Sequence, residues 1–161
     1  MNKIAIYPGT FDPITYGHID IMRRGLKVFN KIIVAVAHNP QKNPLFSFEE
    51  RIEMIKEETK GIEVLEVESF KGLMIDFARK KNVFVIIRGI RMVSDFEYEF
   101  QMALTNRKLD KTIETVFLMP SEEYSYVSSK LLKEASFLGA NLKDFIPANV
   151  ERKLKSKFKD S

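Results

Sequence analysis

Five short runs of aliphatic and β-branched residues, separated by longer stretches of helical pattern, are the feature that most limits the folds open to this chain of 161 residues. The runs span residues 3–7, 31–37, 62–67, 83–87 and 115–119, and residues of this kind favour strands. The second and fourth runs are apolar at nearly every position, which is typical of strands that are covered on both faces of a parallel sheet. The pattern therefore predicts an α/β fold, a doubly wound parallel sheet of five strands with right-handed crossovers.

Local signals between these runs indicate where the helices begin and end. Ser47–Glu50 and Ser94–Glu97 both have the form of a capping box, in which a Ser and a Glu three residues later satisfy free amides at a helix start. Gly61 and Gly139 stand where helices are expected to stop. A further helix over residues 148–161 is predicted as a basic extension at the carboxyl end of the α/β unit.

The composition is that of a globular protein, with 45% hydrophobic and 30% charged residues, so residues 1–161 are predicted to form a single domain. The chain contains no cysteine, which excludes disulfides, a thiolate nucleophile and a cysteine-based metal site and favours a cytoplasmic location. The longest apolar runs fall far short of the roughly 20 residues that cross a bilayer, so no membrane partner is expected.

The net charge of +4 suggests a nucleic-acid partner at first, but the charge is concentrated at one end. Residues 151–161 hold five basic and two acidic residues, which leaves residues 1–150 with a net charge of only +1. The basic helix lacks an aromatic stacking platform, so it is interpreted as a solvated, partly amphipathic face and no nucleic-acid partner is expected. RNA binding by this tail stays an alternative, and it predicts an affinity that falls steeply with salt.

The ends of the predicted strands gather reactive side chains. Ligands bind beyond the carboxyl ends of the strands in an open parallel sheet, and the segments after the strands carry His18, Lys42, Arg88 and Arg91. Arg88 directly follows a buried run, where a charge needs a partner. An internal salt bridge and a bound phosphate are both open, and the guanidinium fork favours phosphate. The sequence predicts one crevice for all four side chains.

The loop before the first predicted helix indicates an anion site. Neither G-x-G-x-x-G nor G-x-x-x-x-G-K-[ST] occurs, which argues against a dinucleotide oxidoreductase and a P-loop NTPase. Gly9 and Gly17 instead flank a loop that leads into a helix with His18 in its first turn, and a helix N-terminus with a nearby cation binds anions. A phosphate is the expected occupant, although a lone His more often packs or caps a helix.

Two motifs carry a resemblance to a known family. Thr15-Tyr16-Gly17-His18 is similar to the T/H-x-G-H motif of the nucleotidylyltransferase superfamily, and Val127–Glu134 is similar to its I-S-S-x-x-[RK] element. With Phe48–Arg51, Arg88–Arg91 and residues 95–106, the sequence resembles the bacterial phosphopantetheine adenylyltransferase family over essentially its whole length.

This resemblance implies a Rossmann-like nucleotidyltransferase fold and a Mg²⁺-dependent enzyme that joins ATP and 4′-phosphopantetheine to give dephospho-coenzyme A and pyrophosphate. The attack is expected to be direct and in line, without a covalent protein intermediate, which agrees with the absence of cysteine. The resemblance also implies a homohexamer and makes coenzyme A a candidate feedback inhibitor. No protein ligands are assigned to the Mg²⁺.

The resemblance further implies three catalytic residues. His18 would donate to an α-phosphate oxygen as charge builds there, Thr10 would offer its hydroxyl to the attacking phosphate, and Lys42 would bridge the two reactants. Roles of this kind align two anionic reactants and need no protein base.

The other site residues are assigned by matching positions. The predicted ATP contacts are Thr10, Phe11, His18, Gly89, Ile90, Arg91, Glu99, Tyr124, Ser125, Tyr126, Val127, Ser128, Ser129 and Lys130. The predicted contacts of the pantetheine substrate are Thr10, Lys42, Leu73, Met74, Arg88 and Asn106. Ser128 and Ser129 would also cap a helix, and Lys130 departs from the Ser or Thr that is common at its position.

Two other functions stay open. A sibling enzyme would couple a nucleotide to nicotinamide mononucleotide or glycerol phosphate, and Arg88, Met74 and Asn106 are the positions that would discriminate. An inactive nucleotide sensor would bind ATP without releasing pyrophosphate.

Overall fold

The protein is described by a computed structural model that covers residues 3–38, 41 and 43–159. Five strands form one sheet in the order β3-β2-β1-β4-β5, and all neighbouring pairs are parallel. They are β1 (Ile4–Gly9), β2 (Lys31–Ala37), β3 (Leu65–Phe70), β4 (Val85–Gly89) and β5 (Glu114–Leu118). The predicted five-stranded parallel sheet is confirmed.

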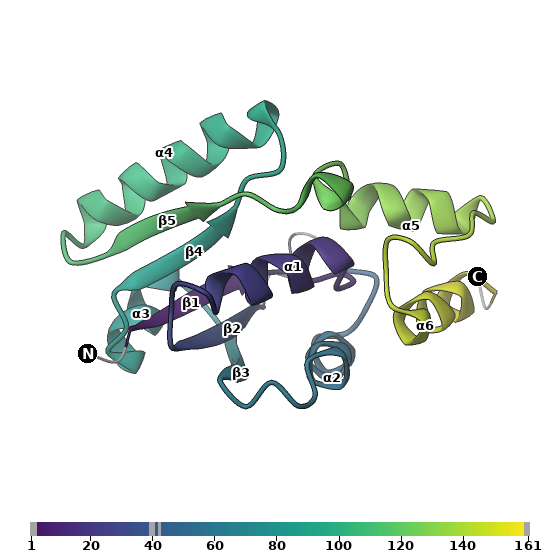
Figure 1. Ribbon diagram of the computed structural model, residues 1–161, viewed down its shortest axis with the longest axis horizontal. Helices are drawn as coiled ribbons and strands as arrows, with labels where there is room; N and C mark the ends of the chain where they lie inside the picture. The colour runs from purple at the N-terminus through teal and green to yellow at the C-terminus, as the bar shows by residue number, and fades with distance from the viewer. Residues whose placement is uncertain (1–2, 39–40, 42, 160–161) are drawn as a thin grey trace.

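Helices connect the strands and continue beyond the last one (Figure 1). They are α1 (Tyr16–Gly25), α2 (Phe48–Glu58), α3 (Met74–Lys81), α4 (Val93–Leu109), the short 3-10 turn η2 (Glu122–Tyr124), α5 (Ser129–Phe137) and α6 (Ala148–Lys159). Figure 1 shows α4 lying along the edge strand β5, and α5 with α6 at the end of the molecule toward which β4 and β5 point. Within the described residues, no helix has the length and apolar character needed to span a membrane.

Helices cover both faces of the sheet, as a doubly wound fold requires. On one face, Val34 and Val36 of β2 join a continuous core with buried side chains of α1, α2, α5 and α6. On the other face, Ile33 and Ala35 of the same strand pack against α3. Alternate residues of one strand thus enter two different cores, which is why this run is apolar at nearly every position.

The strand bounds agree with the sequence pattern to within two residues for β1, β2 and β5. β3 begins at Leu65 rather than at residue 62, because the chain is still turning there: the Leu65 amide donates to the Ile62 carbonyl at 3.1 Å. The apolar residues just before β3 belong to this turn.

β4 also begins later than predicted, at Val85 rather than at residue 83. Asn82 ends α3 in the left-handed conformation, with φ 54°, and the Val83 amide donates back to the helix at the Ala78 carbonyl. The strand also ends later than predicted, at Gly89 rather than at residue 87. The prediction that Arg88 follows the strand was wrong, because Arg88 lies within β4.

The predicted capping box of α2 is confirmed. The Glu50 amide donates to Ser47 Oγ at 3.2 Å, and the Ser47 amide donates to Glu50 Oε2 at 2.7 Å. Gly139 ends α5 with φ 87°. The Gly139 and Ala140 amides donate hydrogen bonds to carbonyls in the last turn of the helix, which is the Schellman arrangement. Gly61, with φ 88°, lies in the turn that follows α2.

The predicted capping box at Ser94–Glu97 was wrong. α4 begins at Val93, and its N-cap residue, Met92, makes no side-chain cap bond. Asp95 instead stabilises the entry to the helix, because its carboxylate accepts from the Arg91 amide at 3.2 Å and from the Arg91 side chain. A competing ionic partner therefore decided where this helix starts.

Candidate active site

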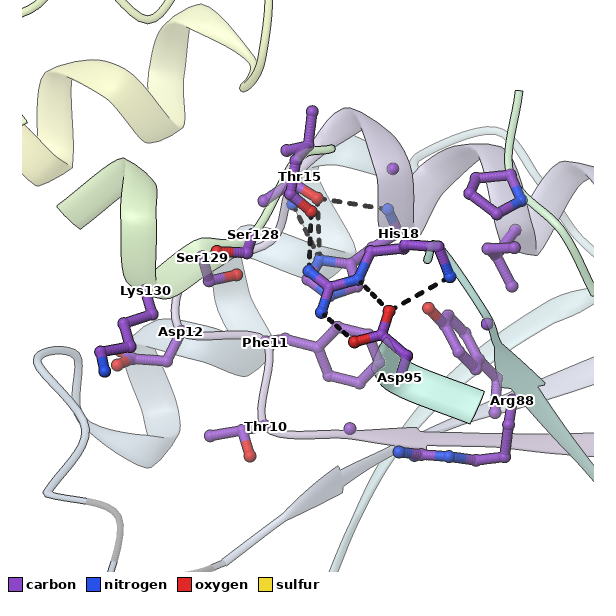
Figure 2. A pocket seen from close by; sticks show the side chains of 18 of the residues that line it. Thr10, Phe11, Asp12, Thr15, His18, Arg88, Asp95, Ser128, Ser129 and Lys130 are labelled. Carbon is purple, nitrogen blue, oxygen red and sulfur yellow. Dashed lines mark hydrogen bonds and ion pairs between the residues drawn. The ribbon is translucent and has the colours of Figure 1, made fainter. Parts of the chain in front are cut away.

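β1 lies beside β4 although two other strands separate them in sequence, so the direction of winding reverses between these two strands. Open α/β sheets bind ligands at such a switch point, outside the carboxyl ends of the strands. A cavity of about 500 Å³ lies there, lined by the ends of β1 and β4, the loop after β1 and the starts of α1, α4 and α5 (Figure 2). The sequence prediction of a crevice at this edge is confirmed.

His18 uses its side chain to cap α1. Thr15 is the N-cap residue, and its amide donates to His18 Nδ1 at 3.0 Å while the His18 amide donates to Thr15 Oγ1 at 3.3 Å. This is a capping box in which an imidazole takes the place of the usual Glu or Gln. Because Nδ1 accepts a hydrogen bond, the neutral ring carries its proton on Nε2. The Nε2–H group is thus left as a donor for a ligand.

Burial, together with the charges of Arg91 and Arg88, lowers the pKa of His18 to about 3. The imidazole is therefore neutral at pH 7 and acts as a hydrogen-bond donor, not as a cation or a proton source. The ring of Phe11 packs edge-on against it, with the ring centres 5.0 Å apart. The expectation that His18 either caps a helix or binds a phosphate was too narrow, because capping leaves the second nitrogen available.

Two helix starts supply free amides at the cavity. In α1, the Gly17 amide has no hydrogen-bond partner among the described residues. In α5, Ser128 caps the helix as predicted, and the amides of Ser129 and Lys130 likewise have no partner within the described part of the chain. All four residues line the cavity. Free amides at helix starts are donors for phosphate oxygens.

Arg88 projects from the end of β4 and pairs with Glu99 of α4. Its Nε donates to Glu99 Oε2 at 2.7 Å and its Nη2 donates to Glu99 Oε1 at 2.5 Å, while Nη1 donates to the Pro8 carbonyl at 2.8 Å. Burial by itself would lower the pKa of Arg88, but the hydrogen bonds and charge of Glu99 outweigh burial and raise it. The internal salt bridge that the sequence left open is present, and both side chains line the cavity.

Arg91 makes a similar set of contacts. Its guanidinium donates to both oxygens of Asp95, at 3.1 and 3.2 Å, and to the Val127 carbonyl at 2.8 Å. Burial would raise the pKa of Asp95, but the hydrogen bonds and charge of Arg91 lower it. The contact with Val127 joins the start of α4 to the segment that enters α5. In Figure 2, Arg88 lies on one side of the cavity and Lys130 on the other.

The loop after β1 is fixed by a buried carboxylate. Asp12 is 5% exposed and accepts from the amides of Leu45 and Phe46, at 3.0 and 2.9 Å. The third donor is Lys133 Nζ of α5. Ser129 Oγ of the same helix donates to the Pro13 carbonyl at 2.7 Å. The loop that carries Thr10 and Phe11 is therefore bonded to α5.

Arg51 of α2 supports the loop after β1. Its side chain is almost fully buried, at 2% exposed. Nη1 donates to the Thr10 carbonyl at 2.7 Å and to the Ala37 carbonyl at 3.2 Å, and Nε donates to the Ser47 carbonyl at 3.3 Å. One guanidinium thus ties the ends of β1 and β2 to the start of α2.

The cavity gathers most of the residues that the sequence predicted. The lining includes Thr10, Phe11, His18, Arg88, Gly89, Arg91, Glu99, Val127, Ser128, Ser129 and Lys130. The described lining does not include Ile90, Tyr124, Ser125, Tyr126, Leu73, Met74 or Asn106. Lys42 lies outside the described residues. His18, Arg88 and Arg91 thus meet as expected, while ligand contacts at all these positions stay predictions.

Sequence reasoning missed several polar residues of the cavity and one support. Tyr7, Asp12 and Lys133 line the cavity, and Arg51 holds the loop after β1 through the Thr10 carbonyl. Lys133 stands inside Val127–Glu134 and Asp12 stands three residues before Thr15, so a charged residue in or beside each motif was the available signal. Arg51 also stands in a segment that carries the resemblance, Phe48–Arg51, but its position after a capping box is typical of a solvated helix and gave no sign of burial.

Comparison with known proteins gives results that agree with this geometry. The cytidylyltransferase-like family model matches residues 6–135. The chain is 57% identical to the phosphopantetheine adenylyltransferase of Caldanaerobacter subterraneus subsp. tengcongensis over 99% of both chains. It is 55% identical to the enzyme of the same name from Desulfosudis oleivorans, over 96% of this chain and 92% of the relative.

A solved structure shows the same fold at low sequence identity. The bifunctional NMN adenylyltransferase/ADP ribose pyrophosphatase from Francisella tularensis superposes with a TM-score of 0.73 and 19% identity. All of this chain is covered, and it spans about half, 51%, of that longer protein. By its sequence, the chain belongs to the phosphopantetheine adenylyltransferase family within the cytidylyltransferase-like nucleotidyltransferases.

Proposed function

We propose that the chain transfers the adenylyl group of ATP to 4′-phosphopantetheine, giving dephospho-coenzyme A and pyrophosphate. Near-full-length relatives at 57%, 55% and 51% identity carry the name of that enzyme. The single observation in the structure that supports it best is the neutral imidazole of His18, which presents Nε2–H beside two arginines and two helix starts.

The reaction needs positioned donors rather than a protein nucleophile. An oxygen of the pantetheine phosphate forms a bond to the α-phosphorus of ATP, and the bond from that phosphorus to the bridging oxygen breaks, so the electron pair leaves with pyrophosphate. Negative charge spreads over the transferring group at the transition state. A preorganised donor such as His18 Nε2–H stabilises this charge without gaining or losing a proton.

The helix starts support a division of the cavity between the two reactants. The free amides of Ser129 and Lys130 at α5 suit the β- and γ-phosphates of ATP. Thr10 lies across the cavity at the end of β1, where its hydroxyl would face the attacking phosphate. Lys42 keeps its proposed role as a bridge between the reactants on the family resemblance alone.

The two arginines enter the proposal with partners already in place. We assign Arg88 to the pantetheine phosphate and Arg91 to the ATP phosphates, on the basis of the matching positions. Each guanidinium is held by a carboxylate and a backbone carbonyl in the structure. A phosphate that binds here must therefore share the guanidinium with the carboxylate or replace the carboxylate.

Mg²⁺ is proposed to enter with the nucleotide. The described residues include no group of three His, Asp or Glu side chains arranged to hold a metal, and each carboxylate at the cavity is engaged: Asp12 by Lys133, Asp95 by Arg91 and Glu99 by Arg88. These residues do not fit a protein-bound metal, so no step is routed through one and the phosphates of ATP are taken as its ligands.

A homohexamer and a cytoplasmic location complete the proposal, together with coenzyme A as a feedback inhibitor that competes at the same crevice. Support for assembly comes from α4, where Phe96, Phe100 and Leu104 are each 44–47% exposed. Sedimentation velocity of the full chain tests the assembly, and a mass of six chains is expected. Inhibition by coenzyme A that is relieved by 4′-phosphopantetheine tests the feedback.

The decisive experiment supplies ATP and Mg²⁺ with 4′-phosphopantetheine, nicotinamide mononucleotide or glycerol 3-phosphate in separate reactions and measures pyrophosphate release. Release with 4′-phosphopantetheine alone is expected. Release with another acceptor would keep the mechanism and replace the substrate. Binding of ATP without release from any acceptor would show an inactive nucleotide sensor.

A substitution at Arg88 tests the assignment of the two phosphate sites. Arg88→Ala should raise the KM for 4′-phosphopantetheine more than the KM for ATP, because it removes a cation from the acceptor side. A rise confined to the KM for ATP would contradict the assignment.

A further inference from the structure

The two sides of the proposed reaction stand on segments that are far apart in sequence. Thr10 and Phe11 belong to the loop after β1, while Ser129 and Lys130 belong to the start of α5. In-line transfer requires the reacting atoms to lie about 3–3.5 Å apart with correct alignment. The distance between these two segments therefore has to be fixed by contacts of the protein itself.

Lys133 makes the one ion pair that joins these two segments within the described residues. Its Nζ donates to Asp12 Oδ2, and the side chains are 25% and 6% exposed. Both residues line the cavity. The only other side-chain bond from α5 to this loop, in the part of the chain that the structure describes, is the neutral one from Ser129 Oγ to the Pro13 carbonyl.

Asp12 is suited to act as a rigid anchor for this ion pair. The carboxylate is already held by the Leu45 and Phe46 amides at 3.0 and 2.9 Å, so it cannot follow Lys133 if α5 moves. Two residues before it, the Thr10 carbonyl is held by Arg51 at 2.7 Å. The loop is therefore fixed on its own side, and Lys133 transmits that fixed position to α5.

We propose that Lys133 is a positioning residue. It acts through Asp12 to set the spacing between the loop after β1, which carries Thr10, and the start of α5, which is proposed to bind the triphosphate. This inference rests on the proposed function, since it concerns the alignment of the same two reactants. Lys133 adds to turnover by holding α5, and its ammonium group is committed to Asp12 instead of to a phosphate.

Lys133→Met tests this assignment by removing the charge and keeping most of the side-chain volume. It should lower kcat by about 10- to 100-fold while the KM values of ATP and 4′-phosphopantetheine change by less than about threefold, because alignment and not affinity is lost. Lys133→Arg should restore most of kcat. The matched control is Lys31→Met, which removes an ion pair with Glu66 that joins β2 to β3 at 2.6 Å and should leave kcat unchanged.

A double-mutant cycle with Asp12→Asn separates action through Asp12 from direct contact with substrate. If Lys133 acts through Asp12, the double variant should be no slower than the slower single variant. Losses that multiply would overturn the proposal. An unchanged kcat in Lys133→Met would overturn it too, and so would a rise confined to the KM for ATP, since that would place the ammonium on a phosphate.

Amide hydrogen exchange tests the link independently of turnover. The Leu131 and Leu132 amides, which bond to Ser128 at the start of α5, should exchange faster in Lys133→Met than in the wild type, whereas Lys31→Met should leave them unchanged. If the wild-type chain made no dephospho-coenzyme A, the proposed function would fail, but this exchange would still judge the link. Equal exchange rates in Lys133→Met and the wild type would overturn it.

Discussion

On one face of the sheet, α1, α2, α5 and α6 bury their apolar side chains in one continuous core, whereas on the other side α4 buries only one residue, Glu99. Phe96, Phe100 and Leu104 of α4 stay 44–47% exposed. The core of the first face is formed entirely within one chain. This face also carries the helix cap of His18 and the loop that holds Asp12. α4 is held at the cavity by the ion pairs of Glu99 and Asp95 and leaves apolar side chains exposed.

The difference places the cavity apart from the exposed apolar surface of α4, which we propose for assembly. The side chains of the site are positioned by buried hydrogen bonds that need no partner subunit, such as those of Arg51 and Asp12. α4 contributes Glu99 and Asp95 to the cavity from one side and apolar rings to solvent from the other. Substitutions in each of the two regions test this contrast.

His18→Ala should have the largest effect on turnover, because it removes the Nε2–H donor from the cavity. Loss of a positioned transition-state donor lowers kcat by about 10²-fold or more, while the affinity for ATP should change little. Steady-state kinetics and equilibrium binding of ATP measure the two quantities. Unchanged turnover would remove His18 from the catalytic residues.

Arg51→Met should strongly reduce the stability of the chain, because Arg51 supports the face of the sheet that α2 covers. It leaves the Thr10, Ala37 and Ser47 carbonyls without their charged donor, and we expect a loss of about 3 kcal/mol in the free energy of unfolding. Urea denaturation of the full chain measures it. Arg152→Met on the exposed side of α6 is the control and should stay within about 0.5 kcal/mol. Equal effects of the two would show that the buried guanidinium is not a support.

Phe100→Asp should abolish self-association through α4 and leave the fold of the chain intact. The ring is 46% exposed and stacks on Phe96 with the centres 5.4 Å apart, so a carboxylate costs little in the single chain but is not tolerated in an apolar interface. Sedimentation velocity measures the mass and far-UV circular dichroism measures the fold. An oligomer of unchanged mass would show that α4 does not form the interface; Arg152→Asp is the control that should keep it.

A pH dependence of stability is also expected from His18. Its pKa falls from 6.5 to about 3 on folding, so between these values the unfolded chain binds more protons than the folded one. The contribution is fully present above pH 6.5 and is lost as the pH falls toward 3. Urea midpoints measured across this range should show a slope in the wild type that is reduced in His18→Gln and kept in His38→Gln. Identical slopes in the three proteins would contradict it.

Much of the fold could be predicted because local pattern and tertiary structure agree. The alternation of apolar strands and capped helices was sufficient for the sheet, and a motif of four residues was sufficient to select His18. The errors arose where a specific contact replaced the expected local rule. Asp95 turned to Arg91 and displaced the predicted cap at Ser94, and Asn82 ended α3 late enough to delay β4.

The supports of the site could not be predicted for a related reason. Arg51 and Asp12 act through partners that stand 41 and 33–34 residues away, and nothing in the local sequence names those partners. A salt bridge of Arg88 was expected as one alternative, but its partner, Glu99, had been assigned to ATP. Sequence spacing shows which charges reach the same edge of a sheet, whereas the pairing among them depends on side-chain geometry.

The two nitrogens of His18 also constrain how this enzyme could be redesigned. Nδ1 caps the start of α1 and Nε2 faces the cavity. A single substitution at His18 therefore changes both the helix cap and the hydrogen-bond donor of the site. Any replacement of His18 must still give the Thr15 amide a partner, for instance a Glu or Gln at position 18. Such a replacement removes the imidazole donor at the same time. Variation in substrate is therefore easier to introduce at Arg88 and Glu99, which line the cavity from β4 and α4 but cap no helix.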